Sequence, residues 1–342
     1  MYYIGLDVAS KSSFVHVIDG RGKKIETKEI TTDKDSYRQY FRPWAKKPVR
    51  VAVEAGGHTR WIYDALTKLG IDVYVVNPHK VKLIAESKRK TDKVDAKILA
   101  DLLRMDGLPK RIHVAEGESR ELRDLLRSRY QLIKSATGLM NHFRGMLRQE
   151  GIKLSARVFR NGDIFDHLRK NKDVPTHLTT VAACYERSIA ELQKQQKELE
   201  ATLKEYRNDD IDLLKSIPWI GEVASKTVYA AISTIKRFQR AKQLTSYCGL
   251  VPSVRSSGER ADYGHITREG RAEVRRVAVL SAHAILRSKN TESKPLRHWH
   301  ERIAKRRGFK TALVGLARKI MEIVFYVLRD RRAYDARLLQ AH

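Results

Sequence analysis

The sequence of 342 residues predicts an α/β domain, then a helical connector, and finally a mainly helical C-terminal domain. Three observations support this prediction. Short apolar strands alternate with helical segments up to about residue 110, two long stretches follow heptad patterns, and the last third carries basic amphipathic helices. We therefore expect three parts, which are residues 1–110, 111–210 and 211–342.

The composition predicts a folded protein with an extended basic surface. Lys and Arg number 68 against 40 Asp and Glu, which leaves a net charge of +28. Because such an excess repels itself, it is usually balanced by a polyanionic partner, most often nucleic acid. Two cysteines are too few for a disulfide framework, and no leader or membrane-length apolar run is evident. We expect a cytoplasmic protein that does not bind membranes.

The first part should open with a three-stranded meander. Residues 2–8 form an apolar run, residues 12–18 alternate like a half-buried strand, and residues 24–31 follow a turn-forming stretch. The α/β pattern then continues with a helix at 33–40, a strand at 49–54, a helix at 59–69, a strand at 72–76 and a helix that opens at Thr91.

Carboxylates stand at two strand ends and at the start of the last helix. Asp7 and Glu54 end apolar strands, where open α/β folds collect ligands. Asp92 and Asp95 share one face of a helix that Thr91 would cap. Each acid alone is also explained by the helix dipole or by a solvated strand end. Together with the meander, the four acids match the ribonuclease H layout, in which clustered acids hold divalent metal ions.

The middle of the chain carries two heptad helices, at 118–149 and 185–206. The first seam is interrupted by Arg129, and the polar stretch 151–175 connects the two helices. Each helix could pair in a coiled coil, either with the other helix or across a dimer. The alternative is an amphipathic hairpin that buries its apolar stripe within one chain, and the pattern leaves these arrangements open.

Residues 213–224 have the cadence of a helix-hairpin-helix, whose turn presents backbone N–H groups to a phosphate. Trp219 stands where such turns usually carry glycine. A packing element and a phosphate contact are therefore both consistent with the sequence.

A Ser-Ser-Gly loop at 256–258 is uninformative alone, because Ser and Gly are common in loops. Arginines surround it at a density suited to phosphate binding, and a serine that attacks a phosphodiester needs such cations. A second basic run directly precedes Asp92. The candidate nucleic-acid contacts are Lys88, Arg89, Lys90, Arg255, Arg260, Arg268, Arg271, Arg275 and Arg276.

These motifs resemble the DEDD transposases, which are insertion-sequence recombinases related to the Piv and MooV invertases. The similar stretches are 3–9, 53–57, 76–78 and 91–96 in the first half, and 249–258 and 266–276 in the second. The resemblance implies a RuvC-like fold with an acid tetrad of Asp7, Glu54, Asp92 and Asp95 that binds Mg²⁺ or Mn²⁺. It also implies that Ser257 is the nucleophile, although its neighbour Ser256 is not excluded.

The activity implied by the resemblance is cutting and rejoining of donor and target DNA through a phosphoserine intermediate, guided by a bridge RNA. A homodimer, or a tetramer in the synaptic complex, is expected, with a connector that forms a coiled coil and an active site that two protomers could share. Two alternatives remain open. One is a RuvC-like junction endonuclease in which metal-activated water attacks, and the other is a nucleic-acid-binding protein without catalysis.

Overall fold

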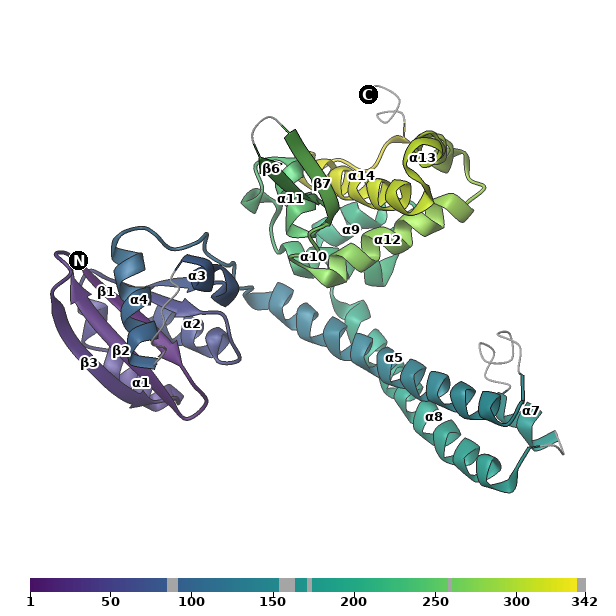
Figure 1. The fold of residues 1–342 in the computed structure, drawn as a ribbon, viewed down its shortest axis with the longest axis horizontal. Helices are drawn as coiled ribbons and strands as arrows, with labels where there is room; N and C mark the ends of the chain where they lie inside the picture. The colour runs from purple at the N-terminus through teal and green to yellow at the C-terminus, as the bar shows by residue number, and fades with distance from the viewer. Residues whose placement is uncertain (85–91, 154–163, 171–173, 258–259, 337–342) are drawn as a thin grey trace. The chain divides into compact units, whose positions relative to one another are not determined.

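The computed structural model describes residues 1–84, 92–153, 164–170, 174–257 and 260–336. They form two compact units, Met1–Ala115 and Glu116–His342 (Figure 1). The predicted phosphate contacts Lys88, Arg89 and Lys90 lie outside the described residues. The N-terminal sheet and the mainly helical second unit confirm the predicted combination of α/β and α structure.

A five-stranded sheet of order β3-β2-β1-β4-β5 forms the centre of the first unit. The meander β1–β2–β3 is antiparallel, whereas β4 and β5 continue the sheet parallel to β1. The elements are β1 (Tyr2–Val8), β2 (Ser12–Asp19), β3 (Lys24–Thr31), α1 (Lys34–Phe41), η1 (Trp44–Lys46), β4 (Val49–Glu54), α2 (Thr59–Lys68), β5 (Asp72–Val76), α3 (Pro78–Ile84) and α4 (Asp92–Arg104).

Strand alternation divides the first unit into two cores. One face of the sheet packs against α1 and α2 through a cluster that includes Leu6, Val51 and Ile62. The opposite face packs against α4, with Ala52 of β4 and Leu99 of α4 in a separate cluster. The side of the sheet on which a residue lies therefore decides whether it meets α2 or α4.

The second unit combines a long helical hairpin with a helical body (Figure 1). Its elements are α5 (Gly117–Gln149), α7 (Ile164–Lys170), α8 (Thr176–Glu205), α9 (Asp209–Lys215), α10 (Glu222–Ile232), η2 (Ile235–Arg237), α11 (Ala241–Tyr247), β6 (Pro252–Ser257), β7 (Arg260–Ile266), α12 (Ala272–Arg287), η3 (Thr291–Ser293), α13 (Lys294–Arg307) and α14 (Phe309–Asp330).

The heptads left open whether the helices pair within the chain or across a dimer, and α5 and α8 pair with each other within the chain. Near the hairpin's tip, Phe143 packs on Tyr185 with ring centroids 5.8 Å apart. The interruption at Arg129 is met by Glu200 of α8, at an N–O distance of 2.6 Å. The amide of Gln196 and the Arg129 guanidinium lower the pKa of Glu200 by stabilising its carboxylate. A polar pair inside an apolar seam fixes the register of two helices.

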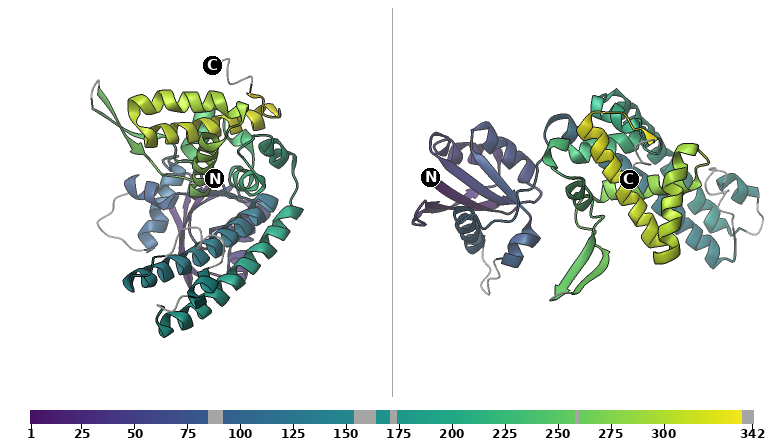
Figure 2. Two further views of the ribbon diagram at one scale, coloured as in Figure 1. Left: turned by 90° about the vertical axis from the view of Figure 1, so that its right-hand side faces the viewer. Right: turned by 90° about the horizontal axis from the view of Figure 1, so that it is seen from above.

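The helical body buries α14 at its centre, with Leu316, Ile320 and Val324 fully buried. Helices α12 and α13 pack against α14. One feature was not predicted from the sequence: residues 252–257 and 260–266 form a two-stranded antiparallel ribbon, β6–β7. Figure 2 shows this ribbon projecting from the helical body. Within the described residues, no helix is both long and apolar enough to cross a membrane.

Candidate active site

Two acids from separate strands lie at one edge and on one face of the N-terminal sheet. Strands β1 and β4 are parallel neighbours, so their carboxyl ends meet at the same edge. Asp7 is the penultimate residue of β1, and Glu54 is the last residue of β4. Residues two apart on a strand share a face. Asp7 therefore lies on the face of Gly5, and Glu54 on the face of Ala52, which packs with α4.

Helix α4 lies directly against β1 on this face. A Cβ atom on Gly5 would lie 1.9 Å from the carbonyl oxygen of Ala96 and 2.7 Å from the nitrogen of Ala100. Only glycine permits such a close approach of helix and strand backbones. The Gly5 position in the first strand therefore seats the helix that carries the other two predicted acids.

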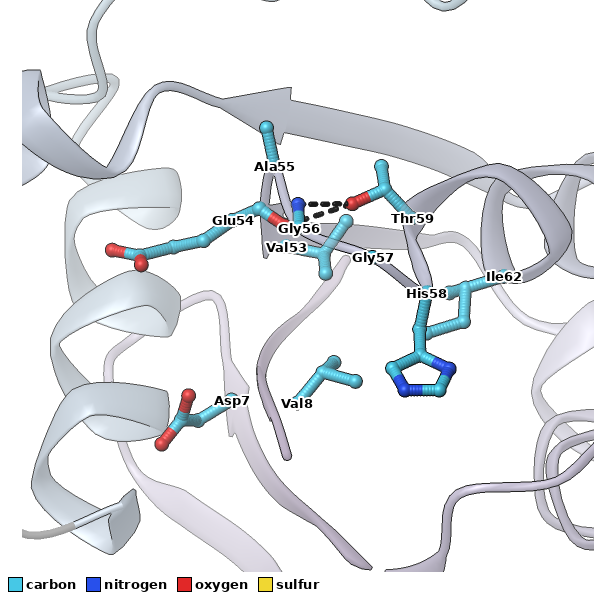
Figure 3. Close-up of a pocket in the computed structure, with 10 residues that line it drawn as sticks. All are labelled: Asp7, Val8, Val53, Glu54, Ala55, Gly56, Gly57, His58, Thr59 and Ile62. Carbon is cyan, nitrogen blue, oxygen red and sulfur yellow. Dashed lines mark hydrogen bonds between the residues drawn. The ribbon is translucent and has the colours of Figure 1, made fainter. Parts of the chain in front are cut away.

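The first turn of α4 lies at the acidic edge because the helix runs antiparallel to β1. Its last residue, Arg104, lies beside Gly22 in the turn between β2 and β3, and that turn flanks the start of β1. The opposite end of α4, which begins at Asp92, must then lie near the ends of β1 and β4. In Figure 3 the side chains of Asp7 and Glu54 both point toward the adjacent helix.

The chemistry of these donors fits a hard divalent cation, since carboxylate oxygens are the ligands that Mg²⁺ and Mn²⁺ prefer. Asp95 is half-buried near the start of α4, whereas the side chain of Asp92 lies outside the described residues. Among the side chains that are described, no three of His, Cys, Asp or Glu gather closely enough to hold a metal ion. The structure therefore brings the acids to one edge without defining a ligand geometry.

A pocket of about 120 Å³ opens at this edge (Figure 3). The right-hand wall in that view is the stretch 56–59, and the sequence analysis did not predict His58 and Thr59 as part of the site. The Thr59 hydroxyl donates to the carbonyl of Glu54 over 3.2 Å and accepts from the N–H of Gly56 over 2.6 Å. The Gly-Gly-His-Thr sequence at 56–59, which leads into a helix, is the pattern that could have indicated these lining residues. The lining residues are Asp7, Val8, Val53, Glu54, Ala55, Gly56, Gly57, His58, Thr59 and Ile62.

Two aromatic side chains, Trp61 and Tyr37, support His58 in this wall. The Trp61 indole N–H donates to His58 Nδ1 over 3.2 Å. Trp61 in turn packs edge-on against Tyr37, with ring centroids 4.9 Å apart. Burial raises the pKa of Tyr37 to about 12, and the nearby charge of Asp7 raises it as well. The His58 ring is therefore held by a packed column that reaches into the main core.

Ser257 is the last residue of β6 and lies at the end of the ribbon. In the antiparallel ladder it pairs with Arg260, and Ser256 pairs with Ala261. Alternation puts residues 255 and 257 on one face of the strand and residue 256 on the other. The backbone thus distinguishes the two candidate serines, and Ser257 shares its face with the position of Arg255. The side chains of these residues lie outside the described part of the chain.

Two glycines with positive φ form the base of the ribbon. A Cβ on Gly249 (φ 66°) would lie 2.5 Å from the carbonyl oxygen of Glu269, and one on Gly270 (φ 114°) would lie 2.2 Å from that of Tyr247. Arg275 donates from Nη1 to the carbonyl of Cys248 over 3.0 Å. The segments before and after the ribbon therefore pack closely against each other. Gly249 and Gly270, which belong to the motifs found in the sequence, permit this close approach.

Several of the predicted phosphate contacts are engaged inside the protein. Arg271 donates to the Tyr247 hydroxyl over 3.0 Å, and Arg275 donates to backbone carbonyls. Arg276 lies over the Tyr130 ring of α5, 3.6 Å from its centroid. Arg268 is exposed. The arginines thus divide into a pair on the ribbon, Arg255 and Arg260, and a group at its base.

The turn between α9 and α10 packs in the helical body. The Trp219 indole N–H donates to Ser293 Oγ over 3.0 Å, and the Trp219 carbonyl accepts from Ser281 Oγ over 3.0 Å. At the first position of α10, Glu222 pairs with Lys215 at 3.1 Å and with Lys226 at 2.5 Å. An acid at this helix N-terminus opposes a phosphate there. These contacts favour the packing interpretation of the motif.

Comparison with known proteins matches both halves of the chain to models of one family. Residues 4–152 match the DEDD transposase model of IS110, described as a transposase. Residues 211–298 match a model described as "Transposase IS116/IS110/IS902 family". The chain belongs to the IS110 family of transposases. The first match contains the four acids and the second contains Ser257, so both predicted sites fall within the family's own regions.

Relatives of this transposase are similar along most of their length. The transposase for insertion sequence element IS1111A of Coxiella burnetii is 27% identical, over 97% of this chain and 90% of that protein. The pilin gene-inverting protein of Moraxella bovis is 27% identical, over 78% of this chain and 75% of that protein. A probable family 20 transposase of Pseudomonas aeruginosa is 24% identical, over 97% and 98%. The transposase is accordingly an enzyme of DNA recombination, which cuts and rejoins DNA.

Proposed function

We propose that the transposase cleaves DNA with the hydroxyl of Ser257 as the nucleophile. We also propose that it has a ribonuclease H-like domain, on which Asp7, Glu54, Asp92 and Asp95 hold divalent metal. The observation that carries the metal site is the convergence of β1, β4 and the start of α4 at one sheet edge. Three separate stretches of sequence bring acids to this edge, which a purely structural role would not require.

The acids would hold Mg²⁺ or Mn²⁺, and such an ion supplies charge stabilisation at the phosphodiester oxygens when bound. The protein's own groups would carry the covalent step. The Ser257 hydroxyl attacks phosphorus and loses its proton, the phosphorus–oxygen bond to the deoxyribose breaks, and that oxygen takes up a proton. A DNA hydroxyl then attacks the phosphoserine, which restores the serine and rejoins the strand. Exchange of one phosphodiester for another needs no external energy source.

The ribbon supports the assignment to Ser257. A nucleophile must reach a phosphate within a bulky duplex, and the end of a projecting two-stranded ribbon offers that access (Figure 2). Ser257 is opposite Arg260 in the ladder, and Arg255 is two residues before it on the same strand. Guanidinium groups at these positions would neutralise the charge that develops on the phosphate.

The net charge of +28 supports nucleic-acid partners beyond the scissile DNA. We include donor DNA, target DNA and a bridge RNA in the proposal, as the family resemblance implies. The same resemblance implies a homodimer, or a tetramer in the synaptic complex.

Cleavage assays with Mg²⁺, the DNA of the element's ends and its RNA test the proposal. We expect Ser257→Ala to abolish the covalent protein–DNA adduct, and Glu54→Gln to lower cleavage by at least about a hundredfold. Asp106→Asn, a change at an exposed acid of the same unit outside the site, is the matched control and should leave cleavage unchanged.

Each alternative has its own outcome in this assay. Cleavage that survives in Ser257→Ala but fails in Glu54→Gln would identify a junction endonuclease in which water attacks. DNA binding without cleavage under any condition would identify a binding protein and contradict both proposed sites.

A further inference from the structure

Arg276 of α12 carries hydrogen-bond donors that the described part of the chain does not use. Its guanidinium lies over the ring of Tyr130 on α5, 3.6 Å from the ring centroid. Among the described residues it makes no hydrogen bond and pairs with no carboxylate. Its nitrogens are not among the buried ones that lack a partner, so they reach solvent. Because stacking occupies only the flat face of a guanidinium, the N–H groups in its plane stay available.

The carboxylate nearest to Arg276 on its own helix is committed elsewhere. Glu273 is the only acid in α12 and lies one turn before Arg276, where an i, i+3 pair is within reach. It pairs instead with Arg127 of α5, at an N–O distance of 3.1 Å. Burial opposes ionisation of Glu273, but its own helix-start N–H and the charge of Arg127 lower its pKa. Glu273 therefore stays ionised beside Arg127, and α12 supplies no counter-charge for Arg276.

Arginines outnumber acids where α5 meets the start of α12. Arg271, just before α12, is close enough to the buried Arg123 of α5 that its charge adds to burial in lowering the pKa of Arg123. Like charges held together destabilise a folded protein unless anions bind beside them. We call this region the α5–α12 strip, and it consists of Arg123, Arg127, Tyr130, Arg271, Glu273 and Arg276.

A nucleic-acid backbone fits the strip better than an acidic side chain of a protein. One carboxylate would neutralise one arginine, whereas a strand of a duplex carries a phosphate for about every 3.4 Å of the helix axis. A guanidinium fork binds phosphate with two parallel hydrogen bonds. Arg271 and Arg275, which the sequence grouped with Arg276, donate to the Tyr247 hydroxyl and to backbone carbonyls. Arg276 is thus the member of this group whose donors are best placed for an outside anion.

We propose that Arg276, supported by the Tyr130 ring, binds a backbone phosphate of nucleic acid at the α5–α12 strip. The contact is made with the phosphodiester that DNA and RNA share, so it is independent of base sequence. The proposal deepens the proposed function and rests on the nucleic-acid partners named there. It uses neither Ser257 nor the four acids, and the aromatic support holds the guanidinium ready before the nucleic acid arrives.

Fluorescence anisotropy tests this contact with the full-length protein in EDTA, so that no cleavage contributes. The two labelled probes are duplex DNA of the element's ends and a short single-stranded RNA, each titrated at several salt concentrations. We expect Arg276→Gln to weaken binding by about tenfold. The slope of log affinity against log salt should become shallower by about 0.9 with the duplex or about 0.7 with the single strand. A change with one probe alone supports the contact and identifies that nucleic acid as its ligand.

Variants of Tyr130 separate the aromatic support from the charge. Tyr130→Phe should bind both probes like the unchanged protein, because the ring remains. Tyr130→Ala should weaken binding by about threefold and leave the salt slope unchanged, because Arg276 keeps its charge. A loss of affinity without a change of slope is a result that general unfolding of the unit would not give.

Arg329→Gln is the matched control, since it removes the same charge from another stacked arginine of the same unit. Arg329 lies over the Tyr326 ring, 4.7 Å from its centroid, but pairs with Asp330 at 2.6 Å. Its donors are therefore already used, and both affinity and salt slope should stay unchanged. Unchanged slopes with both probes in Arg276→Gln would overturn the inference, as would equal losses in Arg329→Gln.

The failure of this inference differs from failure of the proposed function. If Arg276→Gln binds both probes like the unchanged protein while Ser257→Ala still loses the adduct, only the phosphate contact is wrong. If Arg276→Gln makes the salt slope shallower but adducts form without Ser257, the contact stands and the nucleophile is wrong.

Discussion

The hydroxyl of Tyr247 joins two parts of the helical body at the base of the ribbon. It donates to the carbonyl of Ala231 at the end of α10 over 2.9 Å and accepts from Arg271 Nε over 3.0 Å. Arg123 of α5 closes the same helix end by donating to the carbonyls of Ala230 and Ala231. Burial, and then the charge of Arg271, lower the pKa of Arg123 to about 10. The end of α10 is therefore held by side chains from two helices, α5 and α11.

We expect Tyr247→Phe to destabilise the second unit by about 1–3 kcal/mol, because a helix-end carbonyl and a guanidinium each lose a partner. Urea unfolding followed by circular dichroism measures this loss. Tyr334→Phe is the matched control, since the Tyr334 hydroxyl is buried and makes no hydrogen bond among the described residues. Equal stability of the two variants would contradict a structural role for the Tyr247 hydroxyl.

The sequence predicted the positions of the strand-end acids better than it predicted the contacts of the arginines. Asp7 and Glu54 end apolar strands, and strand pairing alone brings such ends to one edge, so local pattern sufficed. Arg271 and Arg275 were grouped with the phosphate contacts because they are close in sequence to Ser257. Their hydrogen bonds to Tyr247 and Cys248 depend on the tertiary fold, which sequence spacing does not contain.

At the scale of elements, α4 is the part on which the acidic edge depends most. Its contact with β1 is possible only because residue 5 has no side chain, since a Cβ there would lie 1.9 Å from the Ala96 carbonyl. Displacement of α4 would move Asp92 and Asp95 away from the two strand ends. The position of α4, and with it that of Asp92 and Asp95, therefore depends on glycine at residue 5.

We expect Gly5→Ala to destabilise the first unit by about 1–3 kcal/mol and to lower DNA cleavage more than it lowers DNA binding. Thermal unfolding and the cleavage assay measure the two effects. Gly20→Ala is the matched control, because a Cβ at Gly20 would have only one neighbour within 4 Å, at 3.7 Å. Cleavage that is unchanged in Gly5→Ala would show that the acids do not need α4 in this position.

The sequence predicted the helices of the hairpin but not the strands of the ribbon. Heptad spacing identified α5 and α8, and the Arg129–Glu200 pair explains why their apolar pattern is interrupted. The ribbon was not predicted, because a Ser-Ser-Gly stretch such as 256–258 is equally common in irregular loops. Its strands are defined by pairing with each other, which a short stretch of sequence specifies weakly.

At the scale of the whole molecule, the chain separates acids and serine into two units. The four acids lie in Met1–Ala115, and Ser257 lies in Glu116–His342. The boundary at residue 115 is close to the predicted boundary at 110, and the structure groups the connector with the C-terminal part. A net charge of +28 over both units suits a protein that handles long polyanions. The covalent link to DNA is then the claim on which the rest of the account depends.

Mass spectrometry of the trapped adduct tests that claim most directly. The transposase is incubated with Mg²⁺, the DNA of its element's ends and its RNA, the adduct is digested with nuclease and protease, and the modified peptide is sequenced. The account predicts a nucleotide joined through phosphate to Ser257 in the peptide that contains residues 256–260. A nucleotide on Ser256 or on any other residue, or cleaved DNA with no modified peptide at all, would contradict it.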